Sequence, residues 1–183
     1  PIPQRVGYEF GGWFSDSILS DDFSLSELNL NNLTLYAKWN PINYTIKFIT
    51  NGGNDLADLV QGYGSDLLMP ANPVKQGYVF SGWYSNSGLT TNFTLTTMPL
   101  NGMTIYAKWE ADLVDVTIKY YTENIIPDTY SLLDQETVKA YTDSTYQATA
   151  RNFNGFGYDG EYSLDDSSGT VMPDGSLVLE LYY

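Results

Sequence analysis

The sequence contains two copies of one pattern, and this internal repeat constrains the fold more than any other feature. Residues 7–15 (GYEFGGWFS) recur as residues 77–85 (GYVFSGWYS). Residues 33–39 (LTLYAKW) recur as residues 103–109 (MTIYAKW). The offset is constant at about 70 residues, and roughly 18 of 40 aligned positions are identical. We therefore predict that residues 41–110 form one complete unit and that residues 1–40 are the back part of a preceding unit.

The half unit in residues 1–40 poses a physical problem, because it lacks the first two strands of its repeat. It would expose an apolar face beside an unpaired strand edge. The side chains on that face would be Phe10, Leu33, Leu35 and Trp39. We expect this half to be completed by another chain or by an exchanged segment, with proteolytic loss of the missing strands as the alternative. We also expect the natural protein to continue upstream.

Residues 111–183 differ from the two copies and are predicted to form a third domain. The run Val-Thr-Ile-Lys-Tyr at 116–120 echoes Tyr-Thr-Ile-Lys-Phe at 44–48, but no Trp follows it. This segment carries 13 acidic and 3 basic residues, which is most of the net charge of −14. Such a step in composition indicates a domain boundary, here near residues 110–114.

Short runs in which apolar and polar residues alternate predict half-buried β-strands throughout. In the two repeats, the residues predicted to face inward are Tyr44, Ile46, Phe48, Met103, Ile105, Ala107 and Trp109, with Leu33, Leu35, Ala37 and Trp39 in the earlier copy. In residues 111–183 they are Val116, Ile118, Tyr120, Leu177, Leu179 and Leu181. The chain is therefore expected to be mainly β, or α+β.

Turns and one short helical stretch complete the expected pattern of each unit. Asn51-Gly52-Gly53 and Asn101-Gly102 are turn signals that need positive φ angles. The single helix-like stretch per unit lies around residues 17–23 or 87–93. Its Thr-rich sequence is a poor helix former.

Composition removes several classes of function. There is no Cys and no His, which excludes Cys nucleophiles, disulfides, His bases and the usual transition-metal sites, so no cofactor is expected. The strong negative charge argues against nucleic acid as a partner. No apolar run approaches the roughly 18 residues of a membrane span, so membrane insertion is not expected.

Acidic residues are the remaining candidates for metal or catalytic chemistry. Clusters occur at Asp21-Asp22, Asp112 and Asp115, and Asp165-Asp166, with Asp159 and Glu161 nearby. None forms a calcium loop of the D-x-D-x-D-G kind, so solvated acidic faces are the simpler interpretation. Small β modules rarely form the cleft that a catalytic carboxylate pair needs, and we expect no enzyme activity.

The spaced aromatic and glycine residues resemble the Listeria–Bacteroides repeat, the B-repeat type of internalin B and of many bacterial surface proteins. The carriers are Tyr-Thr-Ile-x-Phe at 44–48, Asn51-Gly52-Gly53, Gly62-Tyr63-Gly64, Pro73, Gly77-Tyr78-x-Phe80-x-Gly82-Trp83-Tyr84 and Tyr106-Ala107-Lys108-Trp109. The resemblance covers residues 41–110 and the back part of the unit in residues 1–40. It implies small β-grasp (ubiquitin-like) repeats, in which a mixed sheet curls over a short helical segment, in an elongated tandem arrangement.

Residues 111–183 resemble the MucBP-like (mucin-binding-protein-like) module, which is also β-grasp related. The carriers are residues 116–120, the strand 146–150, Gly157-Tyr158 and the closing strand 177–183.

Together the two resemblances imply a secreted protein of the bacterial cell surface or cell wall, in which tandem repeats act as a stalk that presents an adhesin domain. The alternative is a binding module that recognises host glycan or glycoprotein through residues 111–183 or through the repeat surface. The family offers no catalytic residues to carry over.

Aromatic residues are the candidates for ligand contact. The four Trp could stack on sugar rings, but small domains depend on buried aromatics, so structural roles are expected for them. Trp13 and Trp83 each follow a Gly, which would let the indole lie over the backbone. The better surface candidates are Tyr36, Lys38, Tyr106 and Lys108, on the outward face of the closing strands. Cross-strand pairing is the competing explanation for them.

Overall fold

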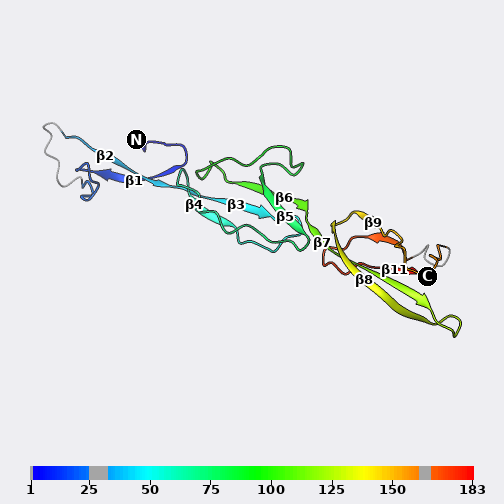
Figure 1. The fold of residues 1–183 in the computed structure, drawn as a ribbon. Coiled ribbons are helices and arrows are strands. Elements are labelled where there is room, and N and C mark those ends of the chain that lie inside the picture. The colour runs from blue at the N-terminus through cyan, green and yellow to red at the C-terminus, as the bar shows by residue number, and fades with distance from the viewer. Residues whose placement is uncertain (1, 25–32, 161–165) are drawn as a thin grey trace. The chain divides into compact units, whose positions relative to one another are not determined.

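The computed structural model describes residues 2–24, 33–160 and 166–183, and its regular elements are all β-strands (Figure 1). In chain order they are β1 (Tyr8–Phe14), β2 (Tyr36–Pro41), β3 (Asn43–Ile49), β4 (Leu59–Gly62), β5 (Tyr78–Tyr84), β6 (Met103–Ala111), β7 (Leu113–Glu123), β8 (Tyr130–Tyr141), β9 (Thr145–Gln147), β10 (Ser168–Thr170) and β11 (Val178–Tyr182). The prediction of a mainly β fold is confirmed.

The two copies of the repeat form sheets of different size. The half repeat is an antiparallel hairpin of β1 and β2, with an irregularity between Phe10 and Trp13. The complete repeat forms a four-stranded sheet in the order β4-β3-β6-β5. Within it, β3 is antiparallel to β4 and parallel to β6, with Ile46 opposite Met103. The complete repeat is thus a mixed sheet with a parallel pair at its centre.

The final segment places its first strand in the same way as the complete repeat does. A three-stranded sheet has the order β11-β7-β8, in which β7 is antiparallel to β8 and parallel to β11. Strands β9 and β10 form a separate antiparallel pair. The sequence echo between residues 44–48 and 116–120 therefore marks strands with equivalent neighbours, because β3 and β7 each lie between an antiparallel and a parallel partner.

The structure divides into two compact units. The first contains residues 1–49, 55–71 and 83–106, and the second contains residues 50–54, 72–82 and 107–183. The division runs through the complete repeat.

Each unit has its own apolar core. Buried residues of the first unit include Ile46, Phe48, Met98 and Ile105, with Trp83 and Phe93 packed against them. The core of the second contains Val116, Ile118, Tyr120, Ala140, Ala148, Val171, Leu179 and Leu181. The predicted inward faces of the complete repeat and of the final segment are thus confirmed at their central positions. In the half repeat the same face is more open, and Leu33 is 44% exposed.

Residues 17–23 and 87–93 form turns rather than the short helix that the sequence allowed. Leu19 and Leu89, which are equivalent positions of the two copies, both have positive φ angles, of 59° and 52°. An L-residue with positive φ cannot continue a right-handed helix. A helix is therefore excluded at the same point in both copies.

Side-chain oxygens hold these turns in the same conformation in both copies. Asp16 Oδ1 accepts hydrogen bonds from the backbone N–H of Ser20 at 3.0 Å and of Asp21 at 2.9 Å. At the equivalent place, Asn86 Oδ1 accepts from Thr90 at 3.2 Å and from Thr91 at 2.9 Å. Asp and Asn can both serve because the turn needs only an acceptor oxygen.

Acidification is expected to loosen the turn at Asp16 and to leave the turn at Asn86 unchanged. The backbone N–H of Asp21 is the main cause that lowers the pKa of Asp16 below its ordinary value of 3.8, with help from Ser20. Because the folded pKa is the lower one, this stabilisation is present above about pH 3.8 and is lost as the pH falls through the folded value. Amide NMR signals of Ser20 and Asp21 should shift in that range.

The Asp16→Asn variant is the control for this titration. It should keep the turn, as Asn86 does in the other copy, and should remove the acid shift of the Ser20 and Asp21 amides. A parallel acid shift at Thr91 would instead indicate general unfolding and would contradict the local explanation.

Candidate functional site

The connections between successive modules are the most regular feature outside the cores. Strand β2 leads into β3, and β6 leads into β7, with a single residue between them in each case: Ile42 at the first joint and Asp112 at the second. These two residues are equivalent positions in the two copies of the repeat. A linker of one residue leaves few backbone dihedrals free to change direction.

At the first joint, which lies within the first unit, both backbone polar groups of Ile42 are hydrogen-bonded. Its N–H donates to Gly7 O at 2.9 Å, and its carbonyl accepts from the N–H of Tyr63 at 2.8 Å. The Tyr63 ring lies edge-on to Tyr8 with ring centroids 5.7 Å apart. Tyr63 follows β4 of the complete repeat, so the hairpin of the half repeat is fixed to the next module by backbone hydrogen bonds and ring packing.

At the second joint, which lies within the second unit, the same two hydrogen bonds recur. The N–H of Asp112 donates to Gly77 O at 2.9 Å, and the N–H of Thr142 donates to Asp112 O at 3.0 Å. Tyr78, the counterpart of Tyr8, donates its hydroxyl to Asp143 Oδ2. This hydrogen bond to a carboxylate raises the pKa of Tyr78.

Both joints also require a glycine on the side of the repeat. Gly7 and Gly77 have φ angles of +80° and +75°. A Cβ atom at Gly7 would lie 2.1 Å from the Tyr63 ring, and one at Gly77 would lie 2.6 Å from Pro173 Cα. The repeat therefore uses one joint geometry before two different modules.

A cation lies over the tyrosine ring at each joint. Arg5 lies 4.1 Å from the Tyr8 ring centroid, and Lys75 lies 3.9 Å from that of Tyr78. An exposed cation–π contact of this kind contributes about 0.5–1 kcal/mol.

The two Trp of the complete repeat have the structural roles that the sequence predicted for them. Trp83 packs against Phe48, with ring centroids 5.1 Å apart, beside the core of the first unit. Trp109 donates its indole N–H to Thr50 O at 2.8 Å. The indole of Trp109 lies so close to Gly53 that an added Cβ would be 2.6 Å from it.

The glycines before Trp13 and Trp83 have φ angles of +116° and +123°, a backbone conformation that favours glycine. Apart from the adjoining residues, no atom lies within 4 Å of a Cβ built on Gly82, and only Phe14, at 3.7 Å, lies near one built on Gly12. At Gly53, by contrast, an indole from a distant part of the repeat lies over the glycine.

Replacing Trp109 by Phe is expected to lower the free energy of unfolding by about 1 kcal/mol, the typical net value of one hydrogen bond. Phe keeps an aromatic ring near Gly53 but cannot donate to Thr50 O. Urea unfolding followed by circular dichroism measures the change. The matched variant Trp13→Phe removes an indole N–H that donates to no described residue, and it should change stability by less than about 0.5 kcal/mol. Equal losses in the two variants would contradict this assignment.

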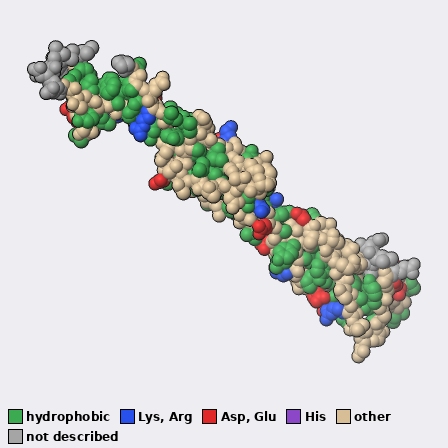
Figure 2. All heavy atoms as spheres, turned by 90° about the horizontal axis from the view of Figure 1, so that it is seen from above, with side chains coloured by type: hydrophobic (Ala, Val, Ile, Leu, Met, Phe, Trp, Pro, Cys, Tyr) green, Lys and Arg blue, Asp and Glu red, His purple; other side chains and the backbone are tan. Residues whose placement is uncertain are grey.

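The predicted surface residues lie on β2 and β6 as expected, with unequal exposure. Tyr36 is 39% exposed, whereas Tyr106, Lys38 and Lys108 are half-buried. Lys38 Nζ lies 5.1 Å from the ring centroid of Phe14. On the face shown in Figure 2, Lys and Arg side chains of the described residues are few and scattered.

The predicted acidic clusters contain no metal-binding arrangement in the parts of the chain that the structure describes, where no three carboxylates gather closely enough to hold an ion. Glu161 and Asp165 lie outside the described residues. Among the described residues there is also no helix with the length and hydropathy of a membrane span.

Sequence reasoning missed the joint residues Ile42, Asp112, Tyr63 and Thr142. A signal was present for part of the set, because Gly7-Tyr8 and Gly77-Tyr78 begin the repeated run. Nothing in the local sequence indicated that Thr142 would take the place of Tyr63, since the two modules that supply these residues differ.

Comparison with known proteins identifies relatives of the repeat. Two proteins of Evansella cellulosilytica, one named as a Gly-rich membrane protein and one as a membrane protein, are 38% and 36% identical to this chain over 120 residues, or 64% of it. Internalin H of Listeria monocytogenes is 32% identical over 111 residues, or 58% of the chain. The matched regions span only 14%, 18% and 20% of these relatives' own lengths, respectively.

The family model described as the Listeria-Bacteroides repeat domain matches residues 1–38 and 44–108. These residues carry both copies of the repeated pattern, including the aromatic and glycine positions on which the resemblance was based. More than half of the sequence is matched, and the chain belongs to the Listeria-Bacteroides repeat family.

Proposed function

We propose that this chain is a non-catalytic spacer segment of a bacterial surface protein, in which the repeats hold a distal adhesive domain away from the cell envelope. The observation that carries the proposal is the recurrence of one joint at both module boundaries. Gly7 and Gly77 accept the same backbone hydrogen bond, although the modules that follow them differ. A spacer that holds a distal domain at a fixed distance from the cell envelope needs connections between its modules that resist bending. Hydrogen-bonded linkers of one residue supply that property.

The family supports the location that we propose. Repeats of this type also occur in internalin H and in two proteins named as membrane proteins. We therefore assign the chain to the extracellular side of the bacterial cell, as part of a secreted, surface-held or cell-wall protein.

Within the spacer, we propose that both complete modules are small β-grasp units and that residues 111–183 form a MucBP-like module. The mixed sheets support this, because β3 and β7 each pair with a parallel strand that closes the module. The short helical segment that the resemblance implied is absent from the described residues, where turns take its place.

A distance measurement tests the spacer. The chain has no Cys, so Cys introduced at Ile18 and Val60 would be the only labelling sites. These residues are 81% and 58% exposed and lie on either side of the first joint, within the first unit. Electron–electron double resonance between spin labels at these positions should give one narrow distance distribution. A broad distribution, of the kind that a flexible linker gives, would refute a spacer role.

A second candidate function is glycan or glycoprotein binding by the repeat surface. It is favoured by Tyr36 and Tyr106, which occupy the same outward position in both copies beside Lys38 and Lys108. A glycan array with the whole chain tests it. Saturable binding that is lost in Tyr36→Ala and Tyr106→Ala would establish this function. The absence of binding would refute it and leave the spacer role as the remaining candidate.

A further inference from the structure

The chain contains three Asn-Gly pairs, and their surroundings differ. The pairs are Asn51-Gly52, Asn101-Gly102 and Asn154-Gly155. In such a pair the backbone nitrogen of the glycine can attack the carboxamide carbon of the asparagine, because glycine has no side chain that obstructs the approach. The attack requires the asparagine side chain and the following peptide group to rotate toward each other. Contacts that prevent this rotation therefore protect an Asn-Gly pair from reaction.

At Asn51 the side chain is held. Its carboxamide nitrogen Nδ2 donates to Ala107 O at 2.7 Å, a carbonyl of strand β6. The turn that contains Asn51 is closed by a hydrogen bond from Gly53 N–H to Thr50 O at 3.1 Å. The carboxamide cannot reach the nitrogen of Gly52 without breaking its hydrogen bond to β6.

At Asn101 the glycine is held instead. Gly102 N–H, the group that would attack, donates to Pro99 O at 3.2 Å. Gly102 also lies against the backbone of β3, where an added Cβ would be 2.0 Å from Thr45 O. The peptide group between Asn101 and Gly102 therefore has little room to rotate.

At Asn154 the described residues provide neither restraint. Asn154 is exposed, and no described residue forms a hydrogen bond with its carboxamide or with Gly155 N–H. Apart from the adjoining residues, no described atom lies within 4 Å of a Cβ built on Gly155. The two reacting groups of this pair can therefore rotate toward each other while the module stays folded.

The turn in residues 153–156 has a counterpart in each copy of the repeat, in residues 5–8 and 75–78. Each of the three is closed by a hydrogen bond from its last N–H to its first carbonyl, at 3.1, 3.0 and 3.1 Å, respectively. The glycine at the third position has a φ angle of +88°, +80° and +75° in the same order. The same backbone turn thus occurs in all three modules.

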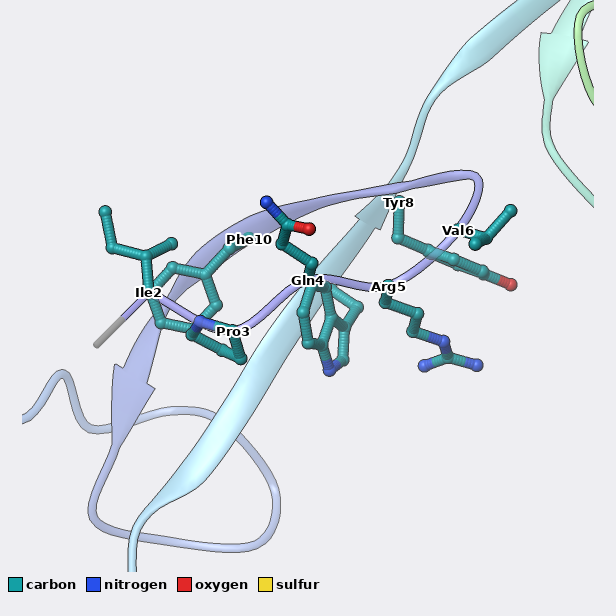
Figure 3. Close-up of a pocket in the computed structure, with 8 residues that line it drawn as sticks. Ile2, Pro3, Gln4, Arg5, Val6, Tyr8 and Phe10 are labelled. Carbon is teal, nitrogen blue, oxygen red and sulfur yellow. The ribbon is translucent and has the colours of Figure 1, made fainter.

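The residue before the glycine differs among the three turns. It is Val6 in the turn that Figure 3 shows, Gln76 in the second and Asn154 in the third. Valine has no carboxamide, and the longer side chain of glutamine would have to close a six-membered ring. Asn154 closes a five-membered ring. Since Val and Gln serve in equivalent turns, the backbone conformation does not require Asn at this position.

We propose that Asn154 is a site of spontaneous deamidation in the folded protein and that Asn51 and Asn101 are protected from this reaction. The Gly155 nitrogen loses its proton to base and forms a bond to Cγ of Asn154, and the bond from Cγ to Nδ2 breaks as ammonia leaves. Water then opens the succinimide ring. Attack of water at one carbonyl gives aspartate, and attack at the other gives isoaspartate, whose main chain runs through the former side-chain carbons.

The modification changes the packing of the last module, because the turn holds Phe153 in place. The Phe153 ring packs against Tyr120 and Tyr183, with ring centroids 5.4 and 5.1 Å apart. Isoaspartate adds one main-chain carbon between Phe153 O and the N–H of Phe156, which lengthens the ring that their hydrogen bond closes. Deamidation should therefore loosen the aromatic cover of this core.

The test is incubation of the whole chain in mildly alkaline buffer, followed by digestion and mass spectrometry of the peptides. We expect the mass gain of deamidation to accumulate at Asn154 at least about tenfold faster than at Asn51 or Asn101, because the protected pairs must first open locally. In concentrated urea the three sites should react at similar rates. Similar rates in the folded chain, or a reaction at Asn154 that occurs only in urea, would overturn the proposal.

The Asn154→Gln variant is the matched control, because it places in this turn the residue that Gln76 provides in the equivalent one. It should fold normally and lose the mass gain at this site. A mass gain that persists in its peptide would assign the reaction to the neighbouring Asn152 and refute the site.

Hydrogen exchange measures the effect on the turn. In the deamidated chain, exchange of the Phe156 amide should accelerate by about fivefold, the effect of losing one typical hydrogen bond. Incubation of Asn154→Gln under the same conditions should leave this exchange unchanged. Equal acceleration in the two chains would show that incubation loosens the turn without deamidation, and would refute the link between them.

Discussion

Replacing Gly102 by Ala is expected to destabilise the complete repeat by at least about 3 kcal/mol. Gly102 has a φ of +63°, and an added Cβ would lie 2.0 Å from Thr45 O and 2.9 Å from Thr45 C and N. These are backbone atoms of β3, so they cannot rotate away as a side chain could. The clash would push β3 from β6 at the start of their pairing, where Ile46 lies opposite Met103.

Thermal unfolding followed by circular dichroism measures the effect. For a module of this size, about 3 kcal/mol corresponds to a fall in Tm of roughly 12 °C or more. Gly64→Ala is the matched control, because Gly64 has a similar φ of +74° and its nearest neighbour would lie at an ordinary 3.8 Å. The control should lose only about 1–2 kcal/mol, the cost of the left-handed conformation. Equal losses of stability in the two variants would show that the left-handed backbone conformation, and not the close contact of Gly102 with β3, determines the requirement for glycine.

The sequence predicted those parts of the fold that depend on local pattern. Alternation placed Ile46 and Ile105 in the core, and both are 0% exposed. The Asn-Gly pairs at 51–52 and 101–102 were expected to need positive φ, and all four residues have it. These properties follow from the pleat of a strand and from the geometry of tight turns, which involve only near neighbours.

Features that join distant segments could not be predicted in this way. The joint at Asp112 depends on Thr142, which directly follows β8 in the next module. Among the described residues, turns stand where a short helix was expected. There, side-chain acceptors at Asp16 and Asn86 hold the backbone N–H groups of the next residues, and this competes with helix formation.

The candidate ligand surface stays a prediction. Tyr36 is exposed and its counterpart Tyr106 is half-buried, because the hairpin of the half repeat has two strands where the sheet of the complete repeat has four. Residues 2–6 and Trp39 line one groove of the half repeat, and local sequence pattern could not predict this meeting of distant segments.

Replacing Gly77 by Ala is expected to open the second joint while leaving the cores on either side folded. An added Cβ would lie 2.6 Å from Pro173 Cα, 2.7 Å from Pro173 Cβ and 2.8 Å from Pro173 O. Relief of this contact requires Gly77 to move away, which breaks its hydrogen bond with the N–H of Asp112. Hydrogen exchange of the Asp112 and Thr142 amides should accelerate by roughly 100-fold if the joint loses about 3 kcal/mol.

Spin labels on either side of this joint connect the change to function. With Cys introduced at Val74 and Ile125, which are 74% and 102% exposed and both lie in the second unit, the distance distribution should broaden in Gly77→Ala. Gly155→Ala is the control, because Gly155 has a φ of +88° and nothing lies within 4 Å of an added Cβ. It should preserve both the narrow distribution and the slow exchange at Asp112. An unchanged distribution in Gly77→Ala would mean that the glycine contact does not fix the joint, and the physical basis of the spacer proposal would be lost.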